Sequence, residues 1–276
     1  MKLYQMADPI RYQHMTTAEL RETFLLEGLF TPGEIQLTYV DLDRTVIGSA
    51  VPTATSLKLE TQPELRADYF CERRELGVLN CGGAGSVEVD GVTFELDKLD
   101  VLYVGRGSKS VTFSSAGSEN PAAFYLLSYQ AHANYPTGMV KFKDLIGLKL
   151  GASETCNQRT IYKAIHKEGI PSCQLVMGFT LLEKGSNWNT MPPHLHMRRS
   201  EVYFYFDIDP AHRVVHLMGP PDETRNIIIA DRQVVVSPGW SIHAGVGTSN
   251  YIFCWGMGGE NQDYTDMDPA SIPGLK

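Results

Sequence analysis

The feature that most constrains the fold is a succession of short β-prone segments separated by glycine- and proline-containing turns. In SVEVDGVTFEL (86–96), apolar and polar residues alternate on both sides of Asp90-Gly91, which is the pattern of a two-residue β-hairpin. Comparable segments recur to residue 259, for example RQVVVSPG (232–239). Many short strands at close spacing favour a β-sandwich or barrel, so the sequence predicts a mainly β protein.

Few segments depart from this pattern. TTAELRETFLLEGLF (16–30) predicts a helix, because Thr16 or Thr17 can cap its N-terminus and Glu19 lies early in it. Residues 140–170 are expected to form a connector that is partly helical. The tail after residue 260 is expected to be irregular.

A weak internal repeat indicates two copies of one β-unit. ERRELGVLN (72–80) resembles MRRSEVYFY (197–205), and DVLYVGRGSKSV (100–111) resembles QVVVSPGWSIHAG (233–245). The chain of 276 residues is long enough for two such units, which we expect at about 1–140 and 141–276. The segments of the first copy contain no histidine, so we expect the second copy to carry the chemistry.

Composition argues against several classes of protein. The chain has 24 basic and 32 acidic residues, which argues against nucleic acid or an anionic membrane surface as the main partner. No apolar run is long enough to span a bilayer, and the first residues lack the apolar core of a secretory signal. The five cysteines are scattered without a C-x-x-C pair and are expected to be buried, reduced thiols of a cytoplasmic protein. The glycine clusters match neither a dinucleotide-binding fingerprint nor a P-loop.

The segment NTMPPHLHMRRSEVYFYF (189–206) carries the strongest functional signal. His194 and His196 are two residues apart, and in a strand this spacing places both imidazoles on one face. Glu201 follows at an odd separation, so a turn must bring it back on the neighbouring strand. His243, after a Pro-Gly turn, offers a third imidazole. Three neutral imidazoles and one carboxylate form a complete ligand set for a divalent transition metal.

The residues around this motif allow two interpretations each. Tyr203 and Tyr205 share a strand face with Glu201, and they either line a pocket or are core aromatic residues. Arg198 and Arg199 either clamp a carboxylate or lie in a solvated turn. The other five histidines are expected to be ordinary surface or hydrogen-bonded polar groups.

The pattern H-x-H-x4-E, followed by a turn and one more histidine, resembles the metal motif of the cupin superfamily. Two positions differ from that motif: its usual glycine is here Gly185, farther upstream, and Trp240 stands where a glycine is usual. Almost end to end, the chain also resembles the 5-keto-4-deoxyuronate isomerase family. The most specific segments are YFCERRELGVLNCGGAG, LYVGRGSKSVTF, NQRTIYK, NTMPPHLHMRRSEVYFYF and PGWSIHAGVGTSNYIFCWGMGGENQ.

The resemblance implies a fold, a cofactor and a reaction. The fold would be a bicupin-like double β-barrel of two jelly-roll-type β-sandwich units with a few short helices. One zinc ion per chain would be held by His194, His196, Glu201 and His243. The chain would form a homohexamer, with the first unit free of metal. The enzyme would interconvert the C1 aldehyde and C2 ketone of a deoxy keto-uronate in the cytoplasmic catabolism of pectin-type polymers.

Such a reaction needs a Lewis acid, a general base and a cation for the substrate carboxylate. The sequence does not identify the base, for which Tyr203, Tyr205, Glu260 and a metal-bound hydroxide are candidates, with Glu201 occupied as a ligand.

The sequence does not rank the cations either, and the candidates are Arg159, Lys163, Arg198 and Arg199. Other functions open at this point are a dioxygenase using ferrous iron, a metal-dependent isomerase of another sugar, and a non-catalytic sugar-binding module.

Overall fold

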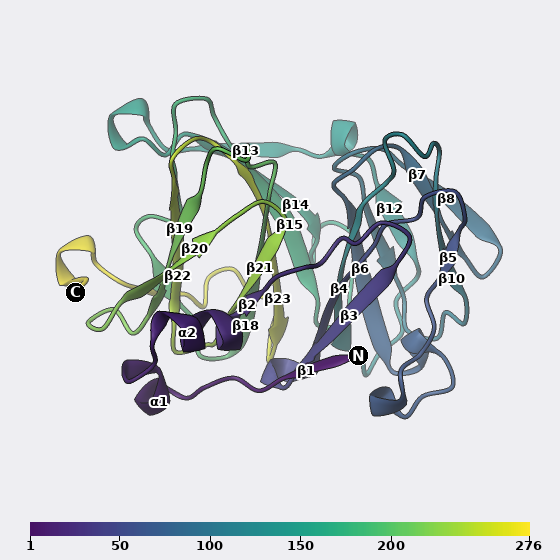
Figure 1. Ribbon diagram of the computed structural model, residues 1–276, viewed down its shortest axis with the longest axis horizontal. Helices are drawn as coiled ribbons and strands as arrows, with labels where there is room; N and C mark the ends of the chain where they lie inside the picture. The colour runs from purple at the N-terminus through teal and green to yellow at the C-terminus, as the bar shows by residue number, and fades with distance from the viewer. The chain divides into compact units, whose positions relative to one another are not determined.

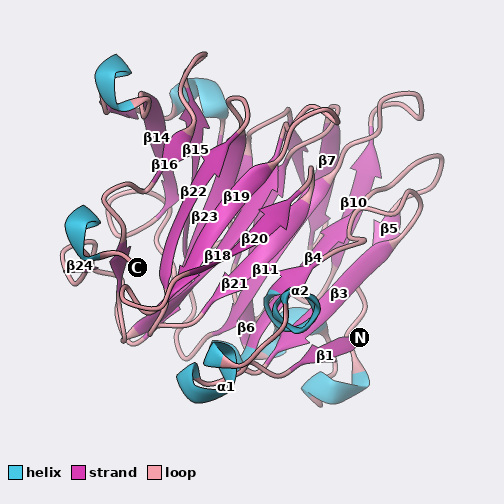
Figure 2. Cartoon of the chain, turned by 60° about the vertical axis from the view of Figure 1, so that its left-hand side comes forward, coloured by secondary structure: helices cyan, strands magenta, loops and turns pink.

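The computed structural model describes residues 1–276, and strands dominate it (Figure 2). The two α-helices, α1 (Pro9–Gln13) and α2 (Thr17–Phe24), are short. The predicted helix is confirmed: Thr16 Oγ1 accepts the Glu19 N–H at 3.3 Å, and the Glu19 carboxylate accepts the Thr16 N–H at 2.7 Å. This reciprocal capping satisfies two N–H groups that the helix leaves free.

Single turns of 3-10 helix connect several strands. They are η1 (Leu42–Arg44), η2 (Pro63–Leu65), η3 (Phe70–Glu72), η4 (Phe142–Asp144), η5 (Ser153–Thr155) and η6 (Ile272–Gly274). No helix combines the length and the apolar character that crossing a membrane would need.

The chain divides into two compact units that exchange segments. Unit 1 comprises Met1–Tyr4, Gly28–Leu145 and Ala164–Met177, and unit 2 comprises Gln5–Glu27, Ile146–Lys163 and Gly178–Lys276. The long segment of unit 1 ends at Leu145, and Ile146 begins a segment of unit 2. The two exchanged segments, which begin at residues 5 and 164, have no signal in the sequence.

Unit 1 is a β-sandwich of two sheets. The strand orders are β1-β3-β4-β11-β6-β9-β12 and β5-β10-β7-β8. The strands are β1 (Lys2–Tyr4), β3 (Ile35–Val40), β4 (Thr45–Ala50), β5 (Leu57–Lys58), β6 (Arg74–Asn80), β7 (Gly85–Val89), β8 (Val92–Leu96), β9 (Val101–Val104), β10 (Val111–Ser115), β11 (Phe124–Gln130) and β12 (Gly138–Val140). Its core joins buried side chains of both sheets, such as Leu76 and Leu126 from one and Val87 and Phe113 from the other.

The predicted hairpin of unit 1 is confirmed as β7 and β8. Asp90 and Gly91 form its turn, with φ angles of 49° and 85°. Positive φ at both central residues is what this type of hairpin turn requires. The Asp90 carboxylate also accepts the N–H groups of Lys109 and Ser110.

Unit 2 repeats this architecture. The strand orders are β13-β14-β15-β23-β18-β21-β2 and β16-β22-β19-β20, with a further two-stranded sheet of β17 and β24. The strands are β2 (Leu25–Leu26), β13 (Gly147–Leu150), β14 (Arg159–Ile165), β15 (Val176–Leu182), β16 (Trp188–Asn189), β17 (His194–Leu195), β18 (Arg199–Phe206), β19 (Val214–Gly219), β20 (Arg225–Ile229), β21 (Gln233–Ser237), β22 (Ile242–Gly247), β23 (Ile252–Gly259) and β24 (Asp268–Pro269).

The strand orders match between the units. The central run β11-β6-β9 of unit 1 corresponds to β23-β18-β21 of unit 2, and β5-β10-β7-β8 corresponds to β16-β22-β19-β20. The repeated segments 72–80 and 197–205 therefore form the equivalent strands β6 and β18. The mainly β fold of two similar β-sandwich units, predicted from the sequence, is confirmed.

The stretch 140–170 differs from the expectation of a partly helical connector. Its regular structure is mainly the antiparallel pair β13–β14, and helical geometry is limited to the single turns η4 and η5. The physical reason is that β13 lies at the sheet edge, where pairing with β14 rather than local propensity fixes its conformation.

The N-terminal helices belong to unit 2, although most of that unit lies far from them in the sequence (Figure 1). The Tyr12 hydroxyl donates to the carbonyl of Met218 at 2.9 Å. The ring of Trp240 meets those of Tyr12 and Phe24 edge to face, with centroids 5.2 and 6.3 Å apart. This contact accounts for Trp240 at the motif position where a glycine is usual.

All five cysteines are free. Cys71, Cys81 and Cys254 are buried as expected, whereas Cys156 is exposed and Cys173 is half-buried. The expectation of burial is wrong for these last two, which lie on connecting segments rather than on core strands.

Candidate metal centre

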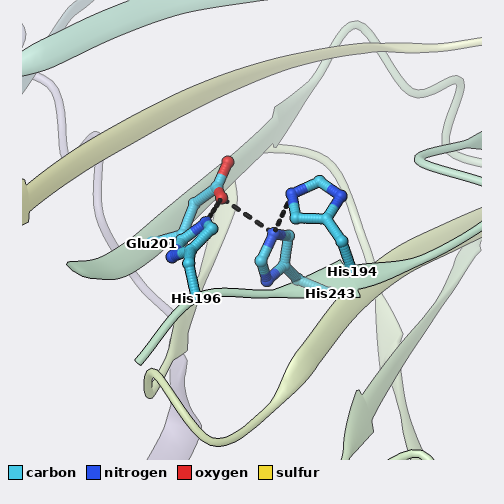
Figure 3. Close-up of side chains that lie close together, drawn as sticks. All are labelled: His194, His196, Glu201 and His243. Carbon is cyan, nitrogen blue, oxygen red and sulfur yellow. Dashed lines mark hydrogen bonds and ion pairs between the residues drawn. The ribbon is translucent and has the colours of Figure 1, made fainter. Parts of the chain in front are cut away.

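Three elements of unit 2 bring the predicted ligands together (Figure 3). His194 lies on β17 with His196 just beyond its end, Glu201 lies on β18 and His243 on β22. The Arg199 N–H donates to the His196 carbonyl at 3.2 Å, which closes the predicted turn. β17 pairs with β24, however, and not with β18. Glu201 is therefore on a different sheet, not on the hydrogen-bonded neighbour that the spacing predicts.

The ligand atoms of the four side chains converge on one point. The Glu201 Oε2 atom is 2.8 Å from His243 Nε2 and 3.0 Å from His196 Nε2, and His243 Nε2 is 3.1 Å from His194 Nε2. One ligand atom from each residue lies within 4.8 Å of all the others. His196, Glu201 and His243 are buried, and His194 is half-buried.

The orientation of His196 is fixed from outside the cluster. Its Nδ1 lies 2.8 Å from the backbone carbonyl of Arg199. Because a carbonyl only accepts, Nδ1 carries a hydrogen, so in the neutral ring the Nε2 lone pair points into the cluster. An outer hydrogen bond of this kind commonly orients a metal-binding histidine.

The electrostatics of the cluster favour an ionised carboxylate among imidazoles. Burial acts to raise the pKa of Glu201, but His243 and hydrogen bonds from His196 and His243 hold it well below its usual range. Burial, followed by the nearby His243, lowers the pKa of His194 to about 3. Burial acts to lower the pKa of His196, yet the hydrogen bond to Glu201 raises it overall.

This donor set fits a divalent cation. One carboxylate and three imidazoles each bring a ligand atom to the same small volume, where unprotonated acceptors would face one another unless a proton or a cation lay between them. Three histidines and one carboxylate suit zinc, iron, nickel and manganese. The buried His-His-Glu-His cluster is thus able to bind a metal.

The cluster opens into a cavity of about 370 Å³. His194, His196 and Glu201 line it, and the cavity is large enough for a small sugar acid. Much of the remaining wall is apolar and includes Leu148, Leu150, Ile161, Phe253, Trp255, Met257 and Met267.

The predicted candidates for the general base differ in whether they line the cavity. Tyr203 lines the cavity, and its hydroxyl lies 2.8 Å from Thr190 Oγ1. Tyr205 is absent from the lining, and its hydroxyl lies 2.7 Å from Nδ1 of the buried His216. Glu260 is exposed and also outside the lining.

The four candidate cations differ in whether they line the cavity and in whether a carboxylate already pairs with them. Arg159, Lys163 and Arg199 line the cavity, whereas Arg198 does not. Arg198 and Arg199 both bind Asp266, and Arg199 also donates to the Met257 sulfur at 3.0 Å. No carboxylate pairs with Arg159 or Lys163, so these two are the cations available to an anion in the cavity.

The sequence reasoning missed some cavity residues. Thr190, Trp255 and Tyr264 line the cavity but carry no recognisable motif. Tyr264 belongs to the tail that was expected to be irregular, so no periodicity marks it. The hydrogen bond between Thr190 and Tyr203 depends on tertiary packing, which the sequence does not show.

The chain is similar over its whole length to named bacterial enzymes. It is 52% identical over 268 residues to the 4-deoxy-L-threo-5-hexosulose-uronate ketol-isomerase of Halalkalibacterium halodurans, covering 97% of each chain. It is 49% identical over 276 residues to the protein of the same name from Lachnoclostridium phytofermentans, covering 100% of both.

Solved structures with low sequence identity share the fold. An IolB-like protein from Salmonella typhimurium matches with a TM-score of 0.71 at 14% identity, covering 90% of this chain and 96% of its own. Bacillus subtilis oxalate decarboxylase, described with Mn(II) centres, matches with a TM-score of 0.57 at 11% identity, covering 81% of this chain and 71% of its own. The model of the KduI/IolB family matches residues 26–272. The chain belongs to the KduI/IolB family.

Proposed function

We propose that the chain is a metal-dependent ketol-isomerase that converts 5-dehydro-4-deoxy-D-glucuronate into 3-deoxy-D-glycero-2,5-hexodiulosonate. Full-length relatives at about half identity are named as ketol-isomerases of a hexosulose-uronate, which supports the substrate class. The structural observation that carries the proposal is one cavity lined by members of the His-His-Glu-His cluster and by two cations without carboxylate partners.

We propose one zinc ion per chain at His194, His196, Glu201 and His243. Such an ion would act as a Lewis acid at the substrate carbonyl and its neighbouring hydroxyl, where isomerisation through an enediol builds up negative charge. The absence of a thiol from the ligand set suits a substrate that offers oxygen atoms.

The other residues of the cavity have roles in binding and proton transfer in this proposal. Arg159 and Lys163 bind the substrate carboxylate, because they are the cations of the cavity that no carboxylate neutralises. Tyr203, which lines the cavity and whose hydroxyl lies 2.8 Å from Thr190 Oγ1, moves a proton between the two reacting carbons. The apolar wall formed by Phe253 and Trp255 limits the access of water.

The assembly, location and pathway belong to the same proposal. β13 leaves large apolar side chains exposed, with Ile146, just before it, at 93% and Leu148 at 50%. Exposed apolar patches commonly mark subunit contacts. This supports a homo-oligomer, for which we propose a hexamer.

Five cysteines without a disulfide support a cytoplasmic location. The substrate class supports a place in the breakdown of pectin-type polymers.

Turnover of the unsaturated-uronate breakdown product, before and after chelation, tests the reaction. We expect activity to be lost with the metal and restored when metal is added back. Unchanged isomerisation by the metal-free protein would contradict the mechanism. Absence of turnover by the metal-loaded protein would contradict the substrate, and substrate-dependent oxygen uptake would indicate a dioxygenase instead.

Elemental analysis tests the ligands independently of activity. The double variant His194→Ala, His196→Ala should retain little metal, because two of four ligands are removed. The matched control replaces two exposed histidines, His14→Ala and His132→Ala, and should keep wild-type metal content. Full occupancy in the first double variant would refute the site.

A further inference from the structure

The hydroxyl of Tyr264 is a buried polar group that the proposed chemistry does not yet use. Tyr264 lines the cavity together with His194, His196 and Glu201. Its oxygen is shielded from solvent and has no hydrogen-bond partner. Leaving a buried hydroxyl unpaired is unfavourable. Buried groups of this kind therefore call for an explanation, and in a cavity wall a bound ligand is one.

The segment that carries Tyr264 is firmly held. The Asp266 carboxylate accepts hydrogen bonds from Arg199 and from Asn261, the latter at 2.8 Å, and Arg198 donates to the Asp266 carbonyl at 2.7 Å. Further along, β24 pairs with β17, the strand that bears His194. Tyr264 is therefore kept beside the metal centre, and its position is not that of a free tail.

The ring of Tyr264 already has partners, which leaves only its hydroxyl unassigned. The Lys163 Nζ atom lies 4.0 Å from the ring centroid, a cation–π contact. Trp255 meets the ring edge to face at 5.9 Å with an interplanar angle of 88°. Tyr264 and Lys163 thus line the cavity side by side, and neither the tyrosine hydroxyl nor the ammonium group has a hydrogen-bond partner.

We propose that Tyr264 is a specificity-determining residue, whose hydroxyl donates a hydrogen bond to a substrate oxygen while its ring positions Lys163 for the substrate carboxylate. This inference rests on the proposed function. Burial raises the pKa of Tyr264 far above its usual range, so the hydroxyl keeps its proton and acts as a donor. A cavity built to bind a substrate oxygen discriminates strongly against analogues that lack it.

The variant Tyr264→Phe tests this role, because it removes the oxygen and keeps the ring that contacts Lys163. We expect kcat/KM to fall by about 10- to 100-fold, mainly through KM, with unchanged metal content. The melting temperature of the ligand-free variant should equal or exceed that of the wild type, because an unpaired hydroxyl is lost. The control Thr265→Ala changes an exposed neighbour on the same segment and should match the wild type in all three measurements.

Two outcomes would overturn the inference. One is a kcat/KM of Tyr264→Phe within twofold of the wild type. The other is a lowered melting temperature, which would show that the hydroxyl supports the ligand-free fold.

A binding measurement separates this inference from the proposed reaction. D-Glucuronate, a stable uronate with an aldehyde carbon, should stabilise the wild type thermally more than it stabilises Tyr264→Phe, and D-glucose should stabilise both weakly. If the wild type shows no turnover but this difference in binding is present, the reaction is refuted and the role of Tyr264 stands. Equal stabilisation of both proteins by D-glucuronate would refute the role of Tyr264.

Discussion

At the scale of single residues, one backbone hydrogen bond decides what His196 can do. With its Nδ1 hydrogen given to the Arg199 carbonyl, the ring presents Nε2 as an acceptor toward Glu201 Oε2, 3.0 Å away. Two acceptors at this distance repel unless a positive charge lies between them. His243 Nε2 lies 2.8 Å from the same carboxylate oxygen. The local geometry therefore favours a cation at the centre of the cluster.

The first residue-scale prediction concerns Glu201, the only charged ligand of the set. Glu201→Gln removes the negative charge but keeps the size of the side chain, so metal affinity should fall by about 10- to 100-fold or more, and turnover should fall with it. Competition with a chromophoric chelator measures the affinity. Wild-type affinity in this variant would contradict the assignment of Glu201 as a ligand.

A second prediction separates Tyr203 from Tyr205 by what each hydroxyl contacts. Tyr203→Phe should lower turnover with little change in stability, because Tyr203 lines the cavity. Tyr205→Phe should leave turnover near the wild type and destabilise the fold by about 1–3 kcal/mol, because the buried His216 loses its partner. Steady-state kinetics and urea unfolding on both variants check this, and the reverse pattern would contradict it.

At the scale of elements, the candidate metal centre depends on a strand that is too short to be stable alone. β17 has two residues, and β24 pairs with it. The Ala270 N–H also donates to the Pro193 carbonyl at 3.0 Å, next to β17. Asp266, in the segment between β23 and β24, forms ion pairs with Arg198 and Arg199. The tail thus supports the segment on which two of the four ligands lie.

The third prediction tests this support through Asp266. Asp266→Asn should lower stability by about 3 kcal/mol, because it leaves the buried Arg199 without its countercharge. Metal affinity should fall by about 10-fold, since the Arg199 carbonyl that orients His196 becomes less fixed. Asp268→Asn, an exposed neighbour on β24, is the control. Stability loss without any change in metal affinity would show that the tail does not position the ligands.

The ion pair between Asp266 and Arg199 also predicts that the stability of the fold depends on pH. Burial acts to raise the pKa of Asp266, but hydrogen bonds from Arg199 and Asn261 lower it overall. A carboxylate with a lowered pKa in the folded state stabilises the fold above its unfolded pKa of about 4, and this stabilisation is lost as the pH falls. The stability difference between the wild type and Asp266→Asn should therefore shrink below about pH 4. Urea unfolding over a pH series measures it, and a constant difference would contradict the assignment.

The elements also show how far the sequence predicts this protein. The β7–β8 hairpin and α2 follow from local signals, an Asp-Gly turn and a capping box. The four candidate ligands follow from the H-x-H spacing and from the turns before Glu201 and His243, whereas the sheet on which Glu201 lies does not follow from them. The β13–β14 pair and the placement of Tyr264 were not found, because both depend on contacts between segments distant in sequence.

At the scale of the whole molecule, the two units share one strand order, and each has a buried glutamate near the start of the same strand, but the two glutamates occupy adjacent positions and not equivalent ones. Glu75 lies on β6, the counterpart of β18 with Glu201. It is fully buried and accepts the N–H groups of Cys173, Gln174 and Leu175, each at 2.7 Å, and the Tyr103 hydroxyl at 2.7 Å. These bonds anchor the segment 173–175 within unit 1, so the carboxylate is engaged in structure.

The last prediction compares substitutions of Glu75 and Glu201. The metal content of the two variants tests whether the chain has one metal site or two. Glu75→Gln keeps the shape of the side chain but removes the charge that the backbone N–H groups bind. Hydrogen bonds to a charged group contribute about 1.5–3 kcal/mol each, so the variant should be destabilised by about 3 kcal/mol or more while binding one metal per chain, as we propose for the wild type. Glu201→Gln should show the opposite pattern, with metal lost and unfolding of the metal-free protein little changed. Elemental analysis and urea unfolding of both variants decide the matter. A lower metal content in Glu75→Gln that is not explained by unfolding would place a second metal in unit 1, contrary to the proposal that only unit 2 carries the chemistry.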